Sequence, residues 1–364
     1  MTDYITEEEK NALFEQLSAL SGAFGVTGNE YGAAAVAERL LAPYTDEVRT
    51  DKRGNVVGIV RSGIEDAPVW VFDAHIDQVG VQVTGISDEG FLGFTDIGLD
   101  ERLLPGQVFS IATRTGERIP AVVTLPRDPF ALDVPSLHTL WLDTGMPAEL
   151  VKERVHIGDF AAFAGALYEI AEGRVCGPAL DDRSCFLSIA CFARRLKESG
   201  ARLPADIVFS GTVREEIGGP GAAAVAAGLN PSLFVALDVC HVEPGSKEDG
   251  KRLGGGPAIA LGGDSDDVVS KAILETARAK DIPHGTYAIT YASGTNAGTV
   301  RVTGEGIRCA VISVPLLYMH APNEIMSLQD IAWAGELLLH FATRFKDDEG
   351  RRGYRAGDGE GGGK

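Results

Sequence analysis

The chain has 364 residues, of which 45% are hydrophobic and 23% are charged, and this is the composition of a globular protein with a large core. A chain of this length predicts two domains. The formal net charge of -19 opposes binding to polyanions, so we expect no nucleic-acid partner.

The N-terminal segment predicts α-helices and no targeting signal. Residues 1–10 lack the basic stretch and the apolar core of a signal peptide, and no run of about 18 apolar residues is available to span a membrane. A capping motif begins at Thr6, and apolar residues follow it at helical spacing. A second helix is predicted over Tyr31–Leu41. We therefore expect a cytoplasmic protein with no membrane partner.

The following segment predicts strands that lead to polar residues. The strand-like stretches are Glu47–Thr50, Asn55–Val60 and Val69–Phe72. The last of them runs directly into His75 and Asp77. Open α/β sheets place their ligand sites at the carboxyl ends of such buried strands, so this point of the chain is a candidate site.

Residues 80–165 differ from the rest of the chain. Short strand-like runs alternate with Gly, Pro and Asp turns, and helical periodicity is nearly absent. The runs are Val81–Val83, Val108–Ala112, Ala121–Thr124 and Phe160–Phe163. This pattern predicts a small all-β domain inserted into an α/β domain formed by residues 1–79 and 166–346.

Alternation of helices and strands resumes after residue 180. Helices are predicted over Ser184–Glu198, Ala222–Ala227, Asp267–Ala279 and Leu328–Phe345, and strands over Ala205–Val213, Leu233–Val239, Tyr287–Tyr291 and Cys309–Val314. The tail, residues 347–364, is rich in glycine and charge, which predicts disorder. The five cysteines form no Cys-x-x-Cys pair and are odd in number, so we expect buried free thiols.

Two adjacent carboxylates, Glu215 and Glu216, follow the predicted strand Ala205–Val213. Neighbouring side chains at a strand end point in different directions, so one can hold a metal ion while the other faces a bound water. Metal-assisted hydrolysis needs both a metal ligand and a group that faces the bound water. A Glu-Glu pair on a solvated loop is commoner than a catalytic pair, and the motifs around it therefore decide between the two.

Each of those motifs also has a structural interpretation. His75 and His320 could be hydrogen-bonded core histidines, but each adjoins an acidic or Pro-bounded motif, which favours metal ligation. Asp181 and Asp182 could cap the following helix, a role that is compatible with ligation by Asp181. Asp238 ends an apolar strand, where an unpartnered carboxylate is costly, so a metal partner is favoured.

Together these motifs resemble the M42 metallo-aminopeptidases, which include glutamyl aminopeptidases and tetrahedral aminopeptidases. The resemblance covers nearly the whole folded chain through the order and spacing of Gly25–Gly28, Asp51–Asn55, His75–Asp77, Asp181–Arg183, Glu215–Glu216, Asp238–Val239 and Tyr318–Pro322. It implies a zinc-exopeptidase-like α/β/α sandwich with a mixed sheet. The all-β insert would be a small barrel-like domain that mediates dimerisation.

The resemblance also implies two divalent metal ions per subunit. Their ligands would be His75, Asp181, Glu216, Asp238 and His320. Asp181 would bridge the ions, with His75 and Asp238 on one side and Glu216 and His320 on the other. Imidazole and carboxylate ligands suit zinc or cobalt, with manganese as a further choice.

The family pattern gives Glu215 the role of general base, taking a proton from the attacking water and passing it to the leaving amine. Asp77 lies two residues after His75, on the same side of an extended segment, and would orient its imidazole. No organic cofactor is expected. The peptide bond after the bridging aspartate is often cis in the family, which predicts a cis bond between Asp181 and Asp182.

The chain departs from the family pattern at Gln78, where glutamate is usual, and at Asn296, where aspartate is usual. The segment Cys240–Gly245 also differs. None of these positions is a predicted ligand, so a working metal site is still expected, and the changes are expected to affect substrate preference. Cations near Arg252 and Arg308 would favour acidic substrates.

The predicted function is hydrolysis of N-terminal residues from short peptides by a homo-oligomer, a dimer that could assemble further into a tetrahedral dodecamer. One alternative is a deacylase or other amidohydrolase that uses the same ligands on the same fold. Another is a catalytically silent binding or assembly protein. The presence of Glu215 and all five ligands disfavours this last alternative.

Overall fold

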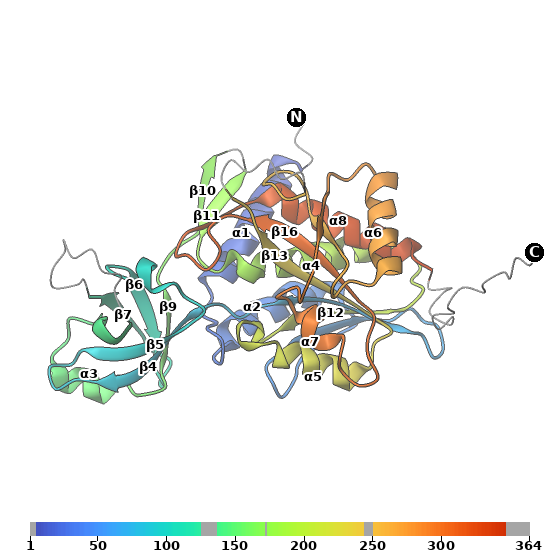
Figure 1. Cartoon of the computed structure of the whole chain (residues 1–364). Helices are drawn as coiled ribbons and strands as arrows, with labels where there is room; N and C mark the ends of the chain where they lie inside the picture. The colour runs from blue at the N-terminus through green and yellow to red at the C-terminus, as the bar shows by residue number, and fades with distance from the viewer. Residues whose placement is uncertain (1–4, 125–136, 172, 244–249, 347–364) are drawn as a thin grey trace, which may run out of the picture.

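The computed structural model describes residues 5–124, 137–171, 173–243 and 250–346 (Figure 1). These residues form an α/β/α sandwich around an eight-stranded mixed sheet, and a closed six-stranded barrel projects from one side of it. The predicted fold class is confirmed. Within these ranges no helix has the length and apolar character needed to cross a membrane. The tail predicted at residues 347–364 lies outside the described residues.

The large sheet supports the candidate site. Its strands, in spatial order, are β1 (Glu47–Thr50), β2 (Val56–Val60), β12 (Asp206–Thr212), β3 (Val69–His75), β13 (Leu233–His241), β16 (Cys309–Leu316), β14 (Ala258–Leu261) and β15 (Gly285–Ala288). Strands β12, β3, β13 and β16 run parallel to one another. Nearly all of their residues are buried and most are apolar, since helices cover both faces of the sheet.

Two helical layers enclose this sheet. One layer contains α1 (Glu7–Gly22), α2 (Tyr31–Leu41), α4 (Leu180–Ser199), α6 (Asp267–Ala279) and α8 (Leu328–Arg344), and the other contains α5 (Pro220–Leu229) and α7 (Asn296–Val300). The first layer packs on aromatic rings, with Phe192 making edge contacts to Phe72 and Phe209 at centroid distances of 5.1 Å. Short 3-10 turns lie at Ala42–Tyr44 (η1) and Glu215–Ile217 (η4).

The barrel is built from residues 80–163. Its strands, in order around the barrel, are β4 (Gly80–Ile86), β5 (Leu92–Ile97), β8 (Leu142–Asp143), β7 (Arg118–Val123), β6 (Val108–Ala112) and β9 (Phe160–Phe163). Along β7, buried Ile119, Ala121 and Val123 alternate with exposed residues, so every second side chain fills the barrel. The connections carry η2 (Glu101–Leu103), η3 (Leu137–Thr139) and α3 (Ala148–Arg154).

The structure corrects some predicted boundaries. Helix α3 is absent from the prediction because Val151 is its one buried residue, which leaves no apolar stripe in the sequence. The strand expected at Tyr287–Tyr291 lies at Gly285–Ala288, where it pairs in register with β14. A small sheet of β10 (Tyr168–Ala171), β11 (Arg174–Gly177) and β17 (Glu324–Ser327) was also not predicted.

Candidate metal centre

The predicted site residues gather at the carboxyl edge of the parallel strands. β3 ends at His75, in register with the last residue of β12, and the turn η4 carrying Glu215 and Glu216 follows β12. Asp238 lies near the end of β13, and His320 follows β16. This edge is the place where open α/β sheets bind their ligands.

Asp181 joins the strand-borne groups from the start of α4. One group of possible ligand atoms comes from His75, Asp181 and Asp238, and a second comes from Asp181, Glu216 and His320. Within each group the atoms lie within 4.8 Å of one another. The two groups share Asp181 and divide as the sequence predicts, and their role as metal ligands stays a prediction.

The distances around Asp181 suit a centre with a shared carboxylate. Nε2 of His75 lies 3.2 Å from Oδ1 of Asp181, and Nε2 of His320 lies 3.3 Å from Oδ2. Nε2 of His320 also lies 3.4 Å from Oε2 of Glu216. Oδ1 of Asp181 and Oε1 of Glu216 are buried and accept no hydrogen bond within the described chain. Buried oxygen atoms without donors fit cation binding, so the donor set matches the expected divalent ions.

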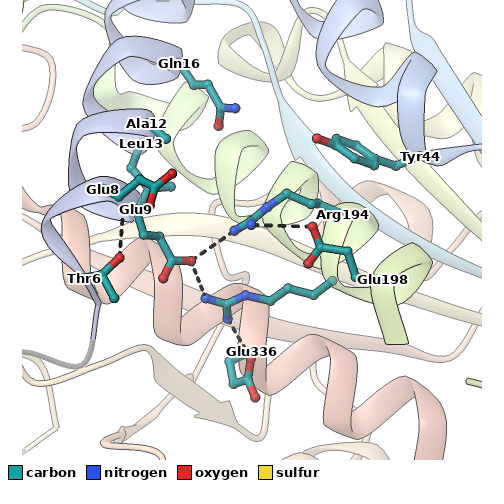
Figure 2. A pocket seen from close by; sticks show the side chains of 11 residues that line it. Thr6, Glu8, Glu9, Ala12, Leu13, Gln16, Tyr44, Arg194, Glu198 and Glu336 are labelled. Carbon is teal, nitrogen blue, oxygen red and sulfur yellow. Dashed lines mark hydrogen bonds and ion pairs between the residues drawn. The ribbon is translucent and has the colours of Figure 1, made fainter. Parts of the chain in front are cut away.

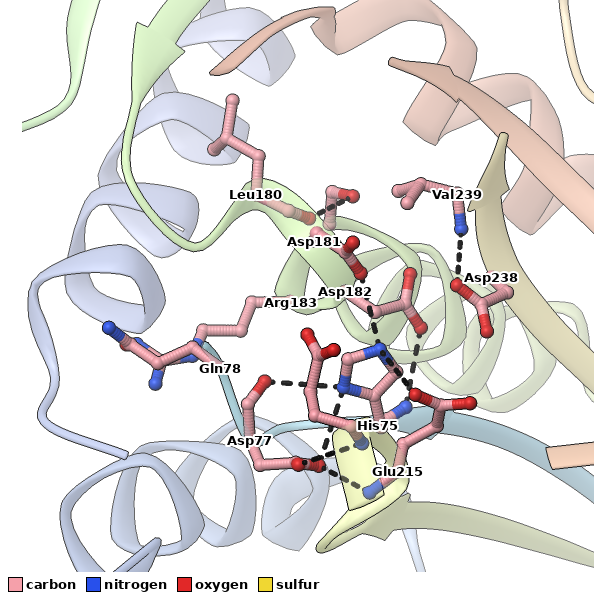
Figure 3. A network of polar contacts seen from close by, with 12 residues as sticks. His75, Asp77, Gln78, Leu180, Asp181, Asp182, Arg183, Glu215, Asp238 and Val239 are labelled. Carbon is pink, nitrogen blue, oxygen red and sulfur yellow. Dashed lines mark hydrogen bonds and ion pairs between the residues drawn. The ribbon is translucent and has the colours of Figure 1, made fainter. Parts of the chain in front are cut away.

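Asp77 holds both sides of this site together (Figure 3). Its side chain is fully buried, and Oδ1 lies 3.4 Å from Nδ1 of His75. The same carboxylate accepts hydrogen bonds from the backbone N–H groups of Glu215 (3.0 Å) and Glu216 (3.3 Å) and from the hydroxyl of Thr27 (2.7 Å). Nδ1 of His75 also lies 3.2 Å from the backbone oxygen of Asp77, so this residue contacts the imidazole through both its backbone and its side chain. The contact with η4, the turn that carries Glu215 and Glu216 and is called the glutamate turn below, was not predicted. That Asp77 orients His75 stays a prediction.

Glu215 stands beside the two groups without belonging to either. Its Oε2 lies 4.0 Å from Nε2 of His75, and the residue is partly buried. Burial raises the pKa of Glu215 to about 7, with Asp77 and Asp181 adding to the shift and His75 opposing it. A carboxyl with a pKa near neutrality can both accept and return a proton at physiological pH.

The other carboxylates also show how much negative charge is concentrated here. Burial raises the pKa of Glu216 to about 8, and nearby Asp181 adds to that shift. Burial lowers the pKa of His320, but its bond to Asp181 and the charge of Glu216 outweigh this effect and raise the pKa to about 9. Carboxylates packed this closely cannot all ionise unless positive charge lies between them, and divalent cations would supply that charge.

The Asp51–Asn55 motif acts as a support for the glutamate turn. The side-chain amide of Asn55 donates to the backbone oxygen of Gly221 (3.1 Å), and its Oδ1 accepts from the N–H of Val213 (3.0 Å). A Cβ at position 221 would lie 2.2 Å from the backbone oxygen of Val213, so only glycine fits there. Asn55 thus holds the chain before Glu215, at Val213, and after it, at Gly221.

Two supporting residues had no sequence signal that would have assigned their roles. Glu324, fully buried at the start of β17, accepts hydrogen bonds from the N–H groups of Leu180 (2.7 Å), Asp181 (3.1 Å) and His320 (2.8 Å). It therefore links two segments that carry predicted ligands. The only hint in the sequence is a glutamate four residues after His320.

Arg183 is the other supporting residue. Its side chain is fully buried and donates to the backbone oxygens of Leu20 (2.6 Å), Ala23 (2.5 Å) and Ile76 (3.1 Å). These contacts tie the end of α1 and the segment after His75 to the start of α4. The Asp181–Asp182 peptide bond is cis, as predicted.

Two of the departures from the family pattern, Asn296 and Gln78, make no side-chain hydrogen bond to a predicted ligand within the described residues. The side-chain amide of Asn296 is buried and donates to Oδ2 of Asp73 (2.8 Å) and Oγ1 of Thr212 (2.9 Å). Gln78 lines a separate cavity, and Arg308 is paired with Asp266 at 3.1 Å. No contact in the described chain therefore supports the expected effect of these three residues on substrate choice. Residues 244–245 of the divergent segment lie outside the described residues.

A mixed α/β sandwich with histidines and carboxylates clustered at the carboxyl edge of its parallel strands suits a metal-dependent hydrolase. Residues 54–337 match the M42 glutamyl aminopeptidase family, and the chain belongs to that family. It is therefore an aminopeptidase, a hydrolase of peptide bonds, and members of this family depend on metal.

Similar proteins span nearly the full length of the chain. A lysyl aminopeptidase from Pyrococcus furiosus is 31% identical over 329 residues, covering 84% of this chain and 90% of the relative. The structure of an aminopeptidase from Desulfurococcus kamchatkensis superposes with a TM-score of 0.89 at 27% identity, covering 96% of this chain and 100% of that chain. A TET aminopeptidase from a Thaumarchaeota archaeon of marine sediment gives a TM-score of 0.84 at 27% identity, covering 92% and 97%.

Proposed function

We propose that this chain is a two-metal aminopeptidase that removes N-terminal residues from short peptides. The observation that carries the proposal is the pair of ligand groups that share Asp181, with Glu215 beside both and part of neither. Two divalent ions held there would polarise the scissile carbonyl and supply a water nucleophile at neutral pH. Zinc and cobalt suit the imidazole and carboxylate donors.

Residues of the chain itself would then transfer the proton and hold the site in place. Glu215 takes the proton of the attacking water and returns it to the leaving amine, a role that its raised pKa supports. Asp77 keeps the imidazole of His75 and the N–H groups of the glutamate turn in place.

The direct test of this function is the Glu215→Gln variant. Loss of a general base lowers kcat by about 10²- to 10⁴-fold, and hydrolysis of aminoacyl nitroanilides by metal-loaded protein measures the loss. Metal content is expected to stay unchanged, since Glu215 is in neither ligand group. Glu198→Gln, an exposed change on α4, is the matched control. Unchanged turnover in Glu215→Gln would refute the proposed role.

The same assay separates the rival substrates. A deacylase would turn over N-acyl amino acids faster than aminoacyl nitroanilides. A solved Thermotoga maritima protein named as an endoglucanase superposes with a TM-score of 0.73 at 26% identity, covering 90% of this chain and 96% of that chain. Glycoside hydrolysis uses two carboxylates that flank the scissile bond and usually no metal, so we expect no activity on soluble cellulose.

We further propose that the protein forms a homo-oligomer through the barrel, as the family resemblance implies. Apolar side chains on the barrel surface are exposed, among them Phe91, Val122, Trp141 and Ile157. These residues would be buried if this surface of the barrel is the one that associates. Light scattering on the intact protein tests the assembly, and a monomer at micromolar concentration would contradict it.

A further inference from the structure

A second cavity lies between the sandwich and the barrel, apart from the predicted metal centre. It has a volume of about 420 Å³, which is within the range of small-molecule sites. Its polar lining comes from Ser21, Gln78, Ser110, Arg118 and Tyr168. None of the predicted metal ligands lines it, and none of the described residues that line it is acidic.

Arg118 brings a positive charge to this cavity without a matching carboxylate. Its guanidinium lies over the ring of Phe24, 3.8 Å from the ring centroid, and makes no ion pair within the described part of the chain. Burial lowers the pKa of Arg118, and no acidic residue offsets that effect. The residue itself is exposed, so its guanidinium is free to pair with an anion that enters the cavity, and a carboxylate matches its planar geometry.

Gln78 supplies a second unused polar group. The residue is only 4% exposed and lines the cavity, yet its side-chain amide has no hydrogen-bond partner in the ranges that the structure describes. The backbone of Gln78 is fixed, because its N–H donates to Gly25 (2.9 Å) and its oxygen accepts from Thr27 (3.1 Å). The polar atoms of this amide are not sealed from solvent, so they border the space of the cavity, where a carboxylate would accept a hydrogen bond from the amide nitrogen.

Another hollow provides a comparison, because its two arginines do have acidic partners. A surface hollow of about 750 Å³ beside α1 contains Arg194 and Arg195 (Figure 2). Both arginines pair with Glu9, at 3.0 and 2.9 Å, and Arg195 also pairs with Glu336 at 2.7 Å. Their charge is therefore already neutralised, whereas that of Arg118 is not.

We infer that the cavity between the sandwich and the barrel binds a small organic monocarboxylate, held by the guanidinium of Arg118 and the amide of Gln78. The ring of Phe24 and the apolar edge at residues 162–164 would cover its hydrocarbon part. A free amino acid fits less well, because its ammonium group would meet no carboxylate among the described lining residues. Glutamate at position 78, usual in the family, would place a negative charge in the same cavity.

Isothermal titration of the intact protein with butyrate tests this inference. Saturable binding of one butyrate per chain is expected. Butyrate binding must persist after the metal is removed by a chelator, because none of the predicted metal ligands lines the cavity. A titration of the chelated protein therefore tests the cavity independently of the proposed aminopeptidase function. Loss of butyrate binding on chelation would place the carboxylate on the metals and overturn the inference.

Two variants and one control complete the test. Arg118→Gln and Gln78→Glu are each expected to weaken butyrate binding about 10-fold or more, which is the effect of losing a hydrogen bond to a charged group. Arg154→Gln removes a charge from the barrel, where Arg154 pairs with Glu117 at 3.1 Å, and should leave binding unchanged. Thermal unfolding shows whether each variant is folded.

Three results would contradict the inference. The first is the absence of saturable butyrate binding. The second is equal affinity in the wild type and in folded Arg118→Gln. The third is inorganic phosphate that binds as tightly as butyrate with the same dependence on Arg118, because the cavity would then be a general anion site.

Discussion

Asn296→Asp should destabilise the protein in a strongly pH-dependent manner. In the wild type, the amide of Asn296 donates to Oδ2 of Asp73 at 2.8 Å, and Ser210 and Thr212 donate to the same carboxylate. Asp73 is fully buried, and burial raises its pKa to about 6. The substitution replaces a donor by a second carboxylate at hydrogen-bond distance.

The size of the effect follows from electrostatics. Two unit charges about 3 Å apart repel by about 5.5 kcal/mol at an effective dielectric constant of about 20, so the pair retains one proton when folded. The unfolded chain releases that proton at its ordinary pKa of about 3.9. The wild-type Asp73, with its pKa of about 6, already keeps a proton at pH 5, so the penalty relative to the wild type grows by about 1.4 kcal/mol per pH unit only above about pH 6. Its upper limit is close to zero at pH 5 and about 2.7 kcal/mol at pH 8.

Urea unfolding of the metal-free protein at pH 5 and pH 8 measures this penalty. Asn230→Asp is the control, because Asn230 is exposed at the end of α5 and the added charge there meets water. The free energy of unfolding of Asn296→Asp, compared with that of the control, should fall steeply between the two pH values. A difference that changes by less than about 1 kcal/mol over this interval would refute the assignment of a shared proton.

Two further variants test the support of the site. Asp77→Asn should lower kcat/KM for aminoacyl nitroanilides about 10- to 100-fold, because the amide cannot accept from both backbone N–H groups of the glutamate turn while orienting His75; wild-type kinetics in metal-loaded protein would contradict this role. Arg183→Met should lower the free energy of unfolding by about 3 kcal/mol or more, because it leaves the buried carbonyls of Leu20 and Ile76 and the partly buried carbonyl of Ala23 without their donor. Urea unfolding beside the exposed change Arg49→Met measures that loss, and equal stabilities would show that the Arg183 contacts are dispensable.

The strands and the groups at their ends could be predicted from the sequence. Apolar runs such as Val69–Phe72 and Leu233–Val239 must be buried on both faces, which requires parallel strands under two helical layers. Parallel strands bring their carboxyl ends to one edge, and this is why residues as distant as His75 and His320 lie together. The grouping of candidate ligands followed from the family pattern alone.

The supporting contacts could not be predicted in the same way. Glu324 acts by accepting backbone N–H groups from segments about 140 residues apart, and backbone donors leave no mark on residue type. Asp77 likewise supports the glutamate turn through N–H groups. The location of Gln78 was also not predicted. Gln78 follows Asp77 directly, but neighbouring side chains of an extended segment point to opposite sides, and Gln78 lines another cavity.

Anomalous X-ray diffraction from crystals of the protein loaded with zinc or cobalt would locate the metal ions themselves. Two peaks are expected about 3.5 to 4 Å apart on either side of Asp181, one next to His75 and Asp238 and the other next to Glu216 and His320. A single peak, or peaks away from Asp181, would contradict a two-metal centre.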